Sequence, residues 1–265
     1  AAALISAGDG VLDVDGVDIV TASDPSVNAN IGGDLAGFTA DIEFDVVDTA
    51  NAVVAEVAAS GFGPGGLDEA NTVVVSGGDV DTAEAAAIQS ISGYEGSASD
   101  YDITDNAAAL ISAGDGVLDV DGVDTVSVTG GPVDADTGEA LAELSKDVEF
   151  DVEDTADNVA AEVTGSNGAG DLDEANAVVV SGGDVTASEA DAIQAISGYV
   201  GTASDYDITD TAAALISAGD DVLNVSGVDT VTVSGGPVLA DTGEKLAELS
   251  KDCLLYTSDA ADDLW

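Results

Sequence analysis

Aspartates recur along this chain in a pattern that could bind a hard cation. In the densest run, Asp115-Gly-Val-Leu-Asp-Val-Asp-Gly-Val-Asp124, carboxylates alternate with glycine and apolar residues. Calcium takes about six to eight oxygen ligands from a flexible turn, which such a run can supply. The pattern makes calcium a candidate ligand, though no cofactor is required, and the metal-ligand candidates are Asp9, Asp13, Asp15, Asp18, Asp115, Asp119, Asp121, Asp124, Asp220 and Asp229.

The third copy of this run argues against a strict calcium requirement. There Asn224 and Ser226 replace Asp119 and Asp121, while the flanking carboxylates persist. Asparagine and serine still offer oxygen, but the site loses charge. The alternative is an Asp-rich turn that returns the chain from helix to strand.

The charge balance excludes most other chemistry. The chain has 54 acidic residues against three basic ones, Lys146, Lys245 and Lys251, and no histidine. We expect no nucleic-acid partner, because that affinity comes from lysine and arginine, and no catalysis, because the usual neutral general base is absent. Paired carboxylates could hydrolyse glycosides, but aromatic residues for a sugar platform are few, so a carbohydrate-active protein is a minor alternative. The expected partners are cations.

A long internal repeat organises the chain. Residues 1–10 return at 107–116 and, with one change, at 212–221, a period of about 105 residues. Such periods are typical of solenoids and tandem arrays. The pattern predicts tandem repeats over residues 1–252, truncated at both ends, and a non-repeat tail over residues 253–265.

Four strand-helix units are expected within residues 101–205. The predicted strands are residues 101–104, 125–129, 148–152 and 177–180, the last closed by Ser181-Gly-Gly183, and each precedes a helical run. Because such crossovers are right-handed, we expect a right-handed βα-solenoid, with a parallel sheet on one side and short helices on the other. A tandem β-sandwich array is the alternative.

Many carboxylates are expected to cap helices rather than bind ligands. An aspartate at a helix start accepts backbone N–H bonds and meets the positive end of the helix dipole. Capping boxes are predicted at residues 136–139 and 186–189. The aspartates assigned to this role are Asp81, Asp105, Asp136, Asp154, Asp210 and Asp241.

Two strand faces carry polar rows. In residues 148–152 the apolar side chains alternate with Glu149, Asp151 and then Glu153, which predicts an acidic outer face, either solvated or cation-binding. Threonine and serine alternate in residues 125–129 and 230–234. Hydroxyl ladders of this kind suggest an ice-binding solenoid as a minor alternative.

The segments Tyr206-Asp-Ile-Thr-Asp-Thr-Ala-Ala-Ala-Leu-Ile216 and Gly227-Val-Asp-Thr-Val-Thr-Val-Ser-Gly235 resemble repeats of very large secreted or surface-attached bacterial proteins. Many of those proteins are adhesin-like and also carry repeats-in-toxin calcium modules, but the Gly-Gly-x-Gly-x-Asp nonapeptide does not occur in this chain. The resemblance implies an extracellular or cell-surface array. The tail after Asp252 resembles a translated sequencing adaptor and is interpreted as an artefact.

The sequence therefore predicts a non-catalytic structural or adhesive segment of a large extracellular bacterial protein, acting as a stiff acidic spacer or stalk. One alternative is a calcium-binding module whose Asp-rich turns order the array or bridge surfaces; another is general adaptation to high salt. Expected contacts are neighbouring repeats, surface ligands and end-to-end self-association. No apolar run approaches the ~18 residues of a membrane span, so no membrane insertion is expected.

Overall fold

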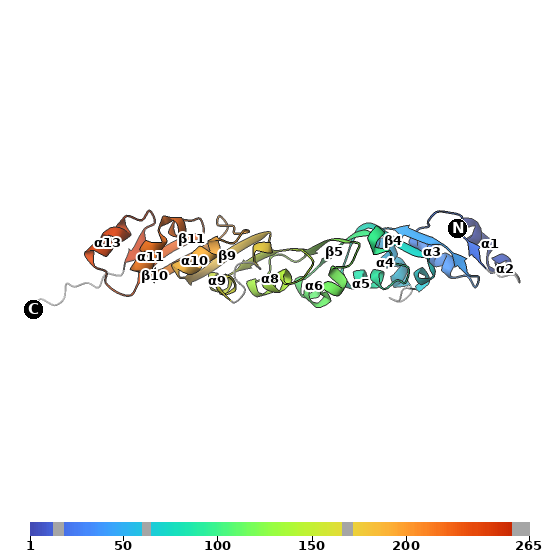
Figure 1. The fold of residues 1–265 in the computed structure, drawn as a ribbon, viewed down its shortest axis with the longest axis horizontal. Coiled ribbons are helices and arrows are strands. Elements are labelled where there is room, and N and C mark those ends of the chain that lie inside the picture. Colours follow the sequence, from blue (N-terminus) through green and yellow to red (C-terminus); the bar gives the residue numbers. More distant parts are fainter. Residues whose placement is uncertain (13–18, 60–64, 166–171, 256–265) are drawn as a thin grey trace, which may run out of the picture. The chain divides into compact units, whose positions relative to one another are not determined.

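A computed structural model describes residues 1–12, 19–59, 65–165 and 172–255. The chain divides into two compact units. Unit 1 comprises Ala1–Gly130 with Leu144–Val148, and unit 2 comprises Gly131–Glu143 with Glu149–Trp265. Within each unit, short strands and short helices alternate along the chain (Figure 1).

Unit 1 contains two parallel sheets. One pairs β1 with β2, and the other runs in the order β3-β4-β5-β6-β7. The strands are β1 (Val20–Thr21), β2 (Ile42–Glu43), β3 (Asp45–Asp48), β4 (Thr72–Val80), β5 (Asp100–Asp105), β6 (Val123–Val128) and the start of β7 (Val148–Glu149). The helices are α1 (Ala2–Ala7), α2 (Asp9–Leu12), α3 (Ala29–Ala36), α4 (Ala50–Ala59), α5 (Thr82–Gln89), α6 (Ala107–Ala113) and α7 (Asp115–Leu118), with 3-10 turns η1 (Gly65–Glu69) and η2 (Gly96–Ala98).

Unit 2 contains one parallel sheet in the order β8-β9-β10-β11-β12. The strands are β8 (Asp151–Asp154), β9 (Ala177–Val185), β10 (Asp205–Thr211), β11 (Val228–Ser234) and β12 (Cys253–Leu255). The helices are α8 (Ala135–Ala142), α9 (Ala156–Thr164), α10 (Ala187–Gln194), α11 (Ala212–Ala218), α12 (Asp220–Leu223) and α13 (Ala240–Ala247), with the 3-10 turn η3 (Leu172–Glu174).

The core of each unit lies between the sheet and its helices. Alternate strand residues are buried because successive side chains point to opposite faces of a strand, and small alanine-rich helices pack over them. In unit 1 the fully buried residues include Val73, Val75, Ile88, Tyr101, Ile103 and Leu110; their counterparts in unit 2 are Val178, Val180, Ile193, Tyr206, Ile208 and Leu215.

These features confirm an α/β protein built from repeated βα units with parallel sheets. The β-sandwich alternative is wrong, because every strand pairing described is parallel and helices connect the strands. The acidic outer face is confirmed: Glu149, Asp151 and Glu153 are exposed, whereas Phe150 and Val152 are buried.

Two strand predictions need correction. The run 148–152 is divided into β7 and β8 at Phe150. The fourth strand does not end at Val180 but continues to Val185, because Gly182 and Gly183 adopt φ of 70° and 102° and form an irregularity in the pairing with β10. Glycine tolerates this backbone conformation without strain, so the strand bulges where a turn was expected.

The helix-capping predictions hold only in part. Asp81 and Thr186 form the complete capping boxes of α5 and α10. The box at residues 136–139 is wrong: the N-cap of α8 is Asp134, whose side chain accepts from the Thr137 N–H, and Asp136 lies in the first turn. Asp241 likewise lies in the first turn of α13, which has Leu239 at its N-cap and no side-chain cap.

The remaining predicted caps act on a different helix. We define a rung as one strand with the helix that follows it. Asp105 at the end of β5 does not cap α6, whose N-cap is Asn106; it accepts instead from the backbone N–H of Thr82, the first residue of α5 in the preceding rung. Four strand-end carboxylates, here called the cross-rung aspartates, each accept from the first N–H of the preceding rung's helix: Asp48, Asp105, Asp154 and Asp210.

The expected boundary at residue 252 falls inside unit 2. Residues 253–255 form β12 and pair in parallel with β11, so the last described residues continue the sheet. Residues 256–265 lie outside the described part of the chain. The interpretation of residues 253–265 as an artefact stays a prediction.

Candidate functional site

The first carboxylate of each Asp-rich turn is hydrogen-bonded to a segment about one rung later. Asp115 Oδ1 accepts from the Ser145 N–H and Oδ2 from the Ser145 hydroxyl, both at 2.8 Å. Asp220 holds Ser250 in the same way, at 2.8 and 2.7 Å, and those bonds lower the pKa of Asp220 below its usual value. Asp9 accepts from the Thr39 N–H at 3.1 Å. These three carboxylates therefore join elements of the fold.

The backbone carbonyls of the turn are also occupied. Gln89 Nε2 donates to the Val117 carbonyl at 2.9 Å, and the Tyr94 hydroxyl donates to the Asp121 carbonyl at 2.8 Å. A calcium loop commonly uses backbone carbonyls as ligands. In this turn those two oxygens hold the chain to the neighbouring rung instead.

The turn keeps its geometry when its carboxylates change. In the third copy Gln194 donates to the Val222 carbonyl and Tyr199 to the Ser226 carbonyl, at the same 2.9 and 2.8 Å. Gly122 and its counterpart Gly227 have φ of 100° and 102°. The backbone of the turn is thus held by glutamine and tyrosine, and both contacts persist where Asn224 and Ser226 replace Asp119 and Asp121.

The other predicted ligands are spread over exposed surface. Asp119, Asp121, Asp124 and Asp229 are exposed, and none of their side chains is hydrogen-bonded within the described residues. The described part of the chain contains no group of three or more acidic or cysteine side chains placed to hold a metal ion. Calcium binding stays a prediction, and three of its candidates lie outside the described residues: Asp13, Asp15 and Asp18.

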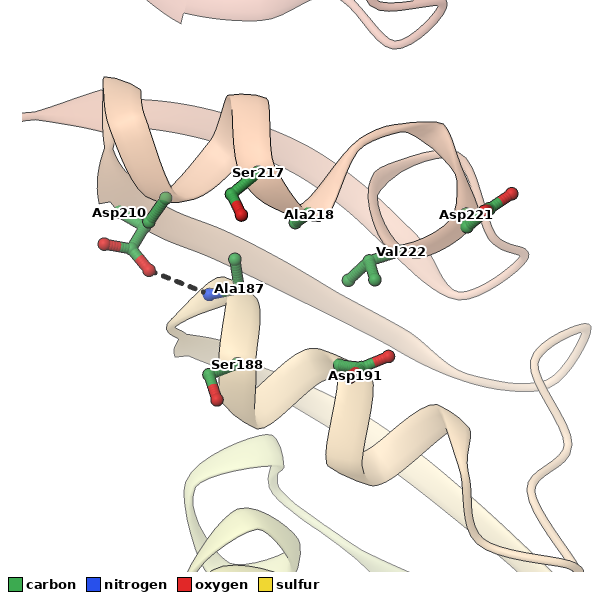
Figure 2. Close-up of a pocket in the computed structure, with 9 residues that line it drawn as sticks. Ala187, Ser188, Asp191, Asp210, Ser217, Ala218, Asp221 and Val222 are labelled. Carbon is green, nitrogen blue, oxygen red and sulfur yellow. Dashed lines mark hydrogen bonds between the residues drawn. The ribbon is translucent and has the colours of Figure 1, made fainter.

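A shallow groove of about 500 Å³ lies between α10 and the α11–α12 segment of unit 2 (Figure 2). Asp191 and Asp221 line it, where the preceding repeat has Ala86 and Gly116. Figure 2 shows that their carboxylates do not point toward one another. At the other end of the groove the Asp210 carboxylate is bound to the Ala187 N–H, so it serves as a cap.

The α8–α9 pair brings three acidic side chains together. Glu162 of α9 faces Asp136 and Glu139 of α8, and its pKa is raised to about 7 by desolvation and by the hydrogen bonds and charges of the two neighbours. Its counterpart Glu56 also has a raised pKa, through burial and the charge of Asp34. Carboxyl groups that share a site cannot all ionise freely, so the two neighbouring acids help to hold the pKa of Glu162 above its usual value.

Two of the three lysines donate to backbone carbonyls. Lys146 Nζ donates to the Val123 carbonyl at 2.8 Å, and Lys251 Nζ donates to the Val228 carbonyl at 2.7 Å, both at the start of a strand. These two cations hold the carbonyls at the start of β6 and β11, the strands that precede them in the chain.

The residues that position the turns were missed by sequence reasoning. Gln89, Tyr94 and Tyr101 recur one period later as Gln194, Tyr199 and Tyr206, and this exact recurrence of bulky polar residues in a variable, alanine-rich background was the available signal. The signal for the cross-rung aspartates was weaker. An aspartate at the end of a strand is equally consistent with a cap on the helix that follows it.

A scan against family models, a search of curated proteins and a search of solved structures each found no match. Among the described residues, no helix has the length and apolar character needed to span a bilayer.

Proposed function

We propose that this chain is a non-catalytic structural or adhesive segment of a large extracellular bacterial protein, acting as a stiff acidic spacer. In this proposal the βα units continue as a right-handed solenoid. Each rung then stacks only on its neighbours, and length rather than a reactive site is the functional property.

The observation that carries the proposal is the use of acidic side chains as links between rungs. The cross-rung aspartates, the Asp115–Ser145 and Asp220–Ser250 pairs, and Asp102 with Thr125 each join one rung to another. Hydrogen bonds to charged groups contribute about 1.5–3 kcal/mol each, more than neutral ones. Many such links favour a rigid array over a flexible linker.

Stiffness is the property to test. Small-angle X-ray scattering of the full chain should give the profile of a rod, with a cross-section that stays constant between low and high sodium chloride. A scattering profile of two compact bodies joined by a flexible linker would contradict the spacer role. A radius of gyration that falls as the salt concentration rises would contradict it too.

The alternative is a calcium-binding module, favoured by the exposed, unbonded carboxylates of Asp119, Asp121 and Asp124. Thermal unfolding in low salt, in matched sodium chloride and in calcium followed by chelator separates the two. The spacer predicts equal stabilisation by sodium and calcium at equal ionic strength, since screening alone relieves the repulsion of 54 acidic residues. A chelator-reversible rise with calcium alone supports the module.

A further inference from the structure

The third copy of the Asp-rich turn carries a motif that the other copies lack. Replacement of Asp119 by Asn224 and of Asp121 by Ser226 creates Asn224-Val-Ser226, and no other Asn-x-Ser or Asn-x-Thr triplet occurs in the 265 residues. This triplet is the acceptor signal for asparagine-linked glycosylation. Both replacements are needed to create it, because either one alone leaves the triplet incomplete.

The structure gives the two new side chains no packing or hydrogen-bonding role. Asn224 and Ser226 are exposed, and neither side chain is hydrogen-bonded within the described residues. The contacts that hold this turn use backbone atoms: the Asn224 N–H donates to the Asp220 carbonyl at 3.1 Å, and the Ser226 carbonyl accepts from Tyr199 at 2.8 Å. The identities of both side chains are therefore not fixed by the fold.

The site is also sterically suited to modification. Asn224 follows the last residue of α12 and has φ −106° and ψ 29°, so it lies in a turn rather than inside a helix or strand. Glycosylation acceptors are surface positions in secreted proteins because the attached sugar is bulky and hydrophilic. An exposed turn accepts such a group without disturbing the core beneath it, where Leu223 and Val228 are buried.

We propose that Asn224 is an acceptor for an oligosaccharide supplied by a polyprenyl-diphosphate-linked donor through a membrane transferase. The Asn224 Nδ2 forms a bond to C1 of the first sugar, and the bond from C1 to the diphosphate oxygen breaks. The lipid diphosphate leaves with that electron pair, and the amide loses one proton. This inference rests on the extracellular placement proposed above.

The test is secretion of the full chain from a host with asparagine-linked glycosylation, together with a secreted reporter that is known to be glycosylated. Intact-mass measurement before and after amidase removal of the glycan should show one glycan per chain. The mass shift should be lost in Asn224→Gln and Ser226→Ala, and retained in Ser226→Thr. A secreted, folded chain without the glycan, beside a glycosylated reporter, overturns the proposal.

A matched variant tests the turn itself. Asp119→Asn with Asp121→Ser transplants the triplet into the second copy, whose turn has the same backbone contacts, and should add a second glycan. If Asn224 is modified but the transplanted asparagine is not, the triplet and the turn geometry together do not suffice for modification. That outcome would contradict the argument from turn geometry. Scattering of the unmodified chain tests the spacer separately, so loss of one proposal is distinguishable from loss of the other.

Discussion

Asp210, one residue before the end of β10, accepts a hydrogen bond from the start of α10: its Oδ2 lies 3.1 Å from the backbone nitrogen of Ala187, 23 residues earlier in the chain. The Oδ1 atom of the same carboxylate accepts from the N–H of Thr211, which is the N-cap of the following helix α11. One side chain thus joins the starts of two successive helices. Asp48, Asp105 and Asp154 likewise accept both from the preceding helix and from the N–H of the next residue.

Replacement of Asp210 by alanine should lower the free energy of unfolding by about 1–2 kcal/mol, because two helix-start N–H groups lose their acceptor. Denaturant unfolding of the full chain measures the change. Asp229→Ala on β11 is the control, since this exposed carboxylate is not hydrogen-bonded within the described residues. Equal effects of the two substitutions would contradict the bracing role of Asp210.

Gly138→Ala should destabilise unit 2 by about 1–3 kcal/mol through overpacking. A Cβ at this position in α8 would lie 2.9 Å from Val152 Cγ2, and both Leu172 and Phe150 are close behind it. The matched control is Gly243→Ala one repeat later, where the nearest atom is Val238 Cγ2 at 3.9 Å. That change should stabilise α13 by about 0.5–1 kcal/mol, because alanine favours a helix over glycine. If urea unfolding shows that both variants change the free energy of unfolding in the same direction, the contact of a Cβ at position 138 with Val152 is not what destabilises Gly138→Ala.

Glu162→Gln should flatten the pH dependence of stability between pH 5 and 8. The pKa of Glu162 is raised from 4.5 to about 7, first by desolvation and then by Glu139 and Asp136, so the folded chain binds a proton that the unfolded chain has released. The stability linked to that proton is fully present below the unfolded pKa and is lost as the pH rises through about 7. The glutamine side chain cannot ionise, so the loss of stability that ionised Glu162 causes at pH 8 is absent from the variant.

Urea midpoints across this range check the prediction, with Glu153→Gln on the exposed face of β8 as the control. Parallel curves for the natural chain and Glu162→Gln would show that the α8–α9 cluster holds no proton near neutral pH.

The double variant Asp119→Asn, Asp121→Ser should respond to calcium and sodium as the natural chain does. Its turn is held by Gln89 and Tyr94, which the substitutions do not touch. Thermal midpoints in calcium and in sodium chloride of matched ionic strength give the comparison. A calcium-specific rise that disappears in the double variant would assign those carboxylates as ligands.

The period and the alternation of strands and helices were readable from the sequence because they depend on local patterns. Alternating apolar residues and capping motifs such as Thr186 with Glu189 act within a few residues, and the structure confirms them. The roles of Asp105 and Asp115 could not be predicted in the same way. Their hydrogen-bond donors, Thr82 and Ser145, lie 23 and 30 residues away, so the assignment requires the stacking register.

The same dependence on pairing with distant residues explains why the strand end predicted at Val180 is wrong. A Gly-Gly pair after an apolar run is typical of a turn, and local sequence contains nothing to distinguish a turn from a bulge. The pairing with β10, which resumes at Asp184 and Val185, makes the difference.

The cross-rung aspartates also constrain how such a chain can change its length. Each of them links the end of a strand to the start of the helix in the preceding rung. Donor and acceptor are 19 or 23 residues apart in the sequence, and the link occurs at every second rung. Duplication or loss of two rungs together keeps every acceptor beside its donor, whereas gain of a single rung leaves one helix start without its aspartate. Recombination between repeats should therefore be tolerated in even numbers of rungs, and the repeat of about 105 residues, with its four strand-helix units, meets that condition.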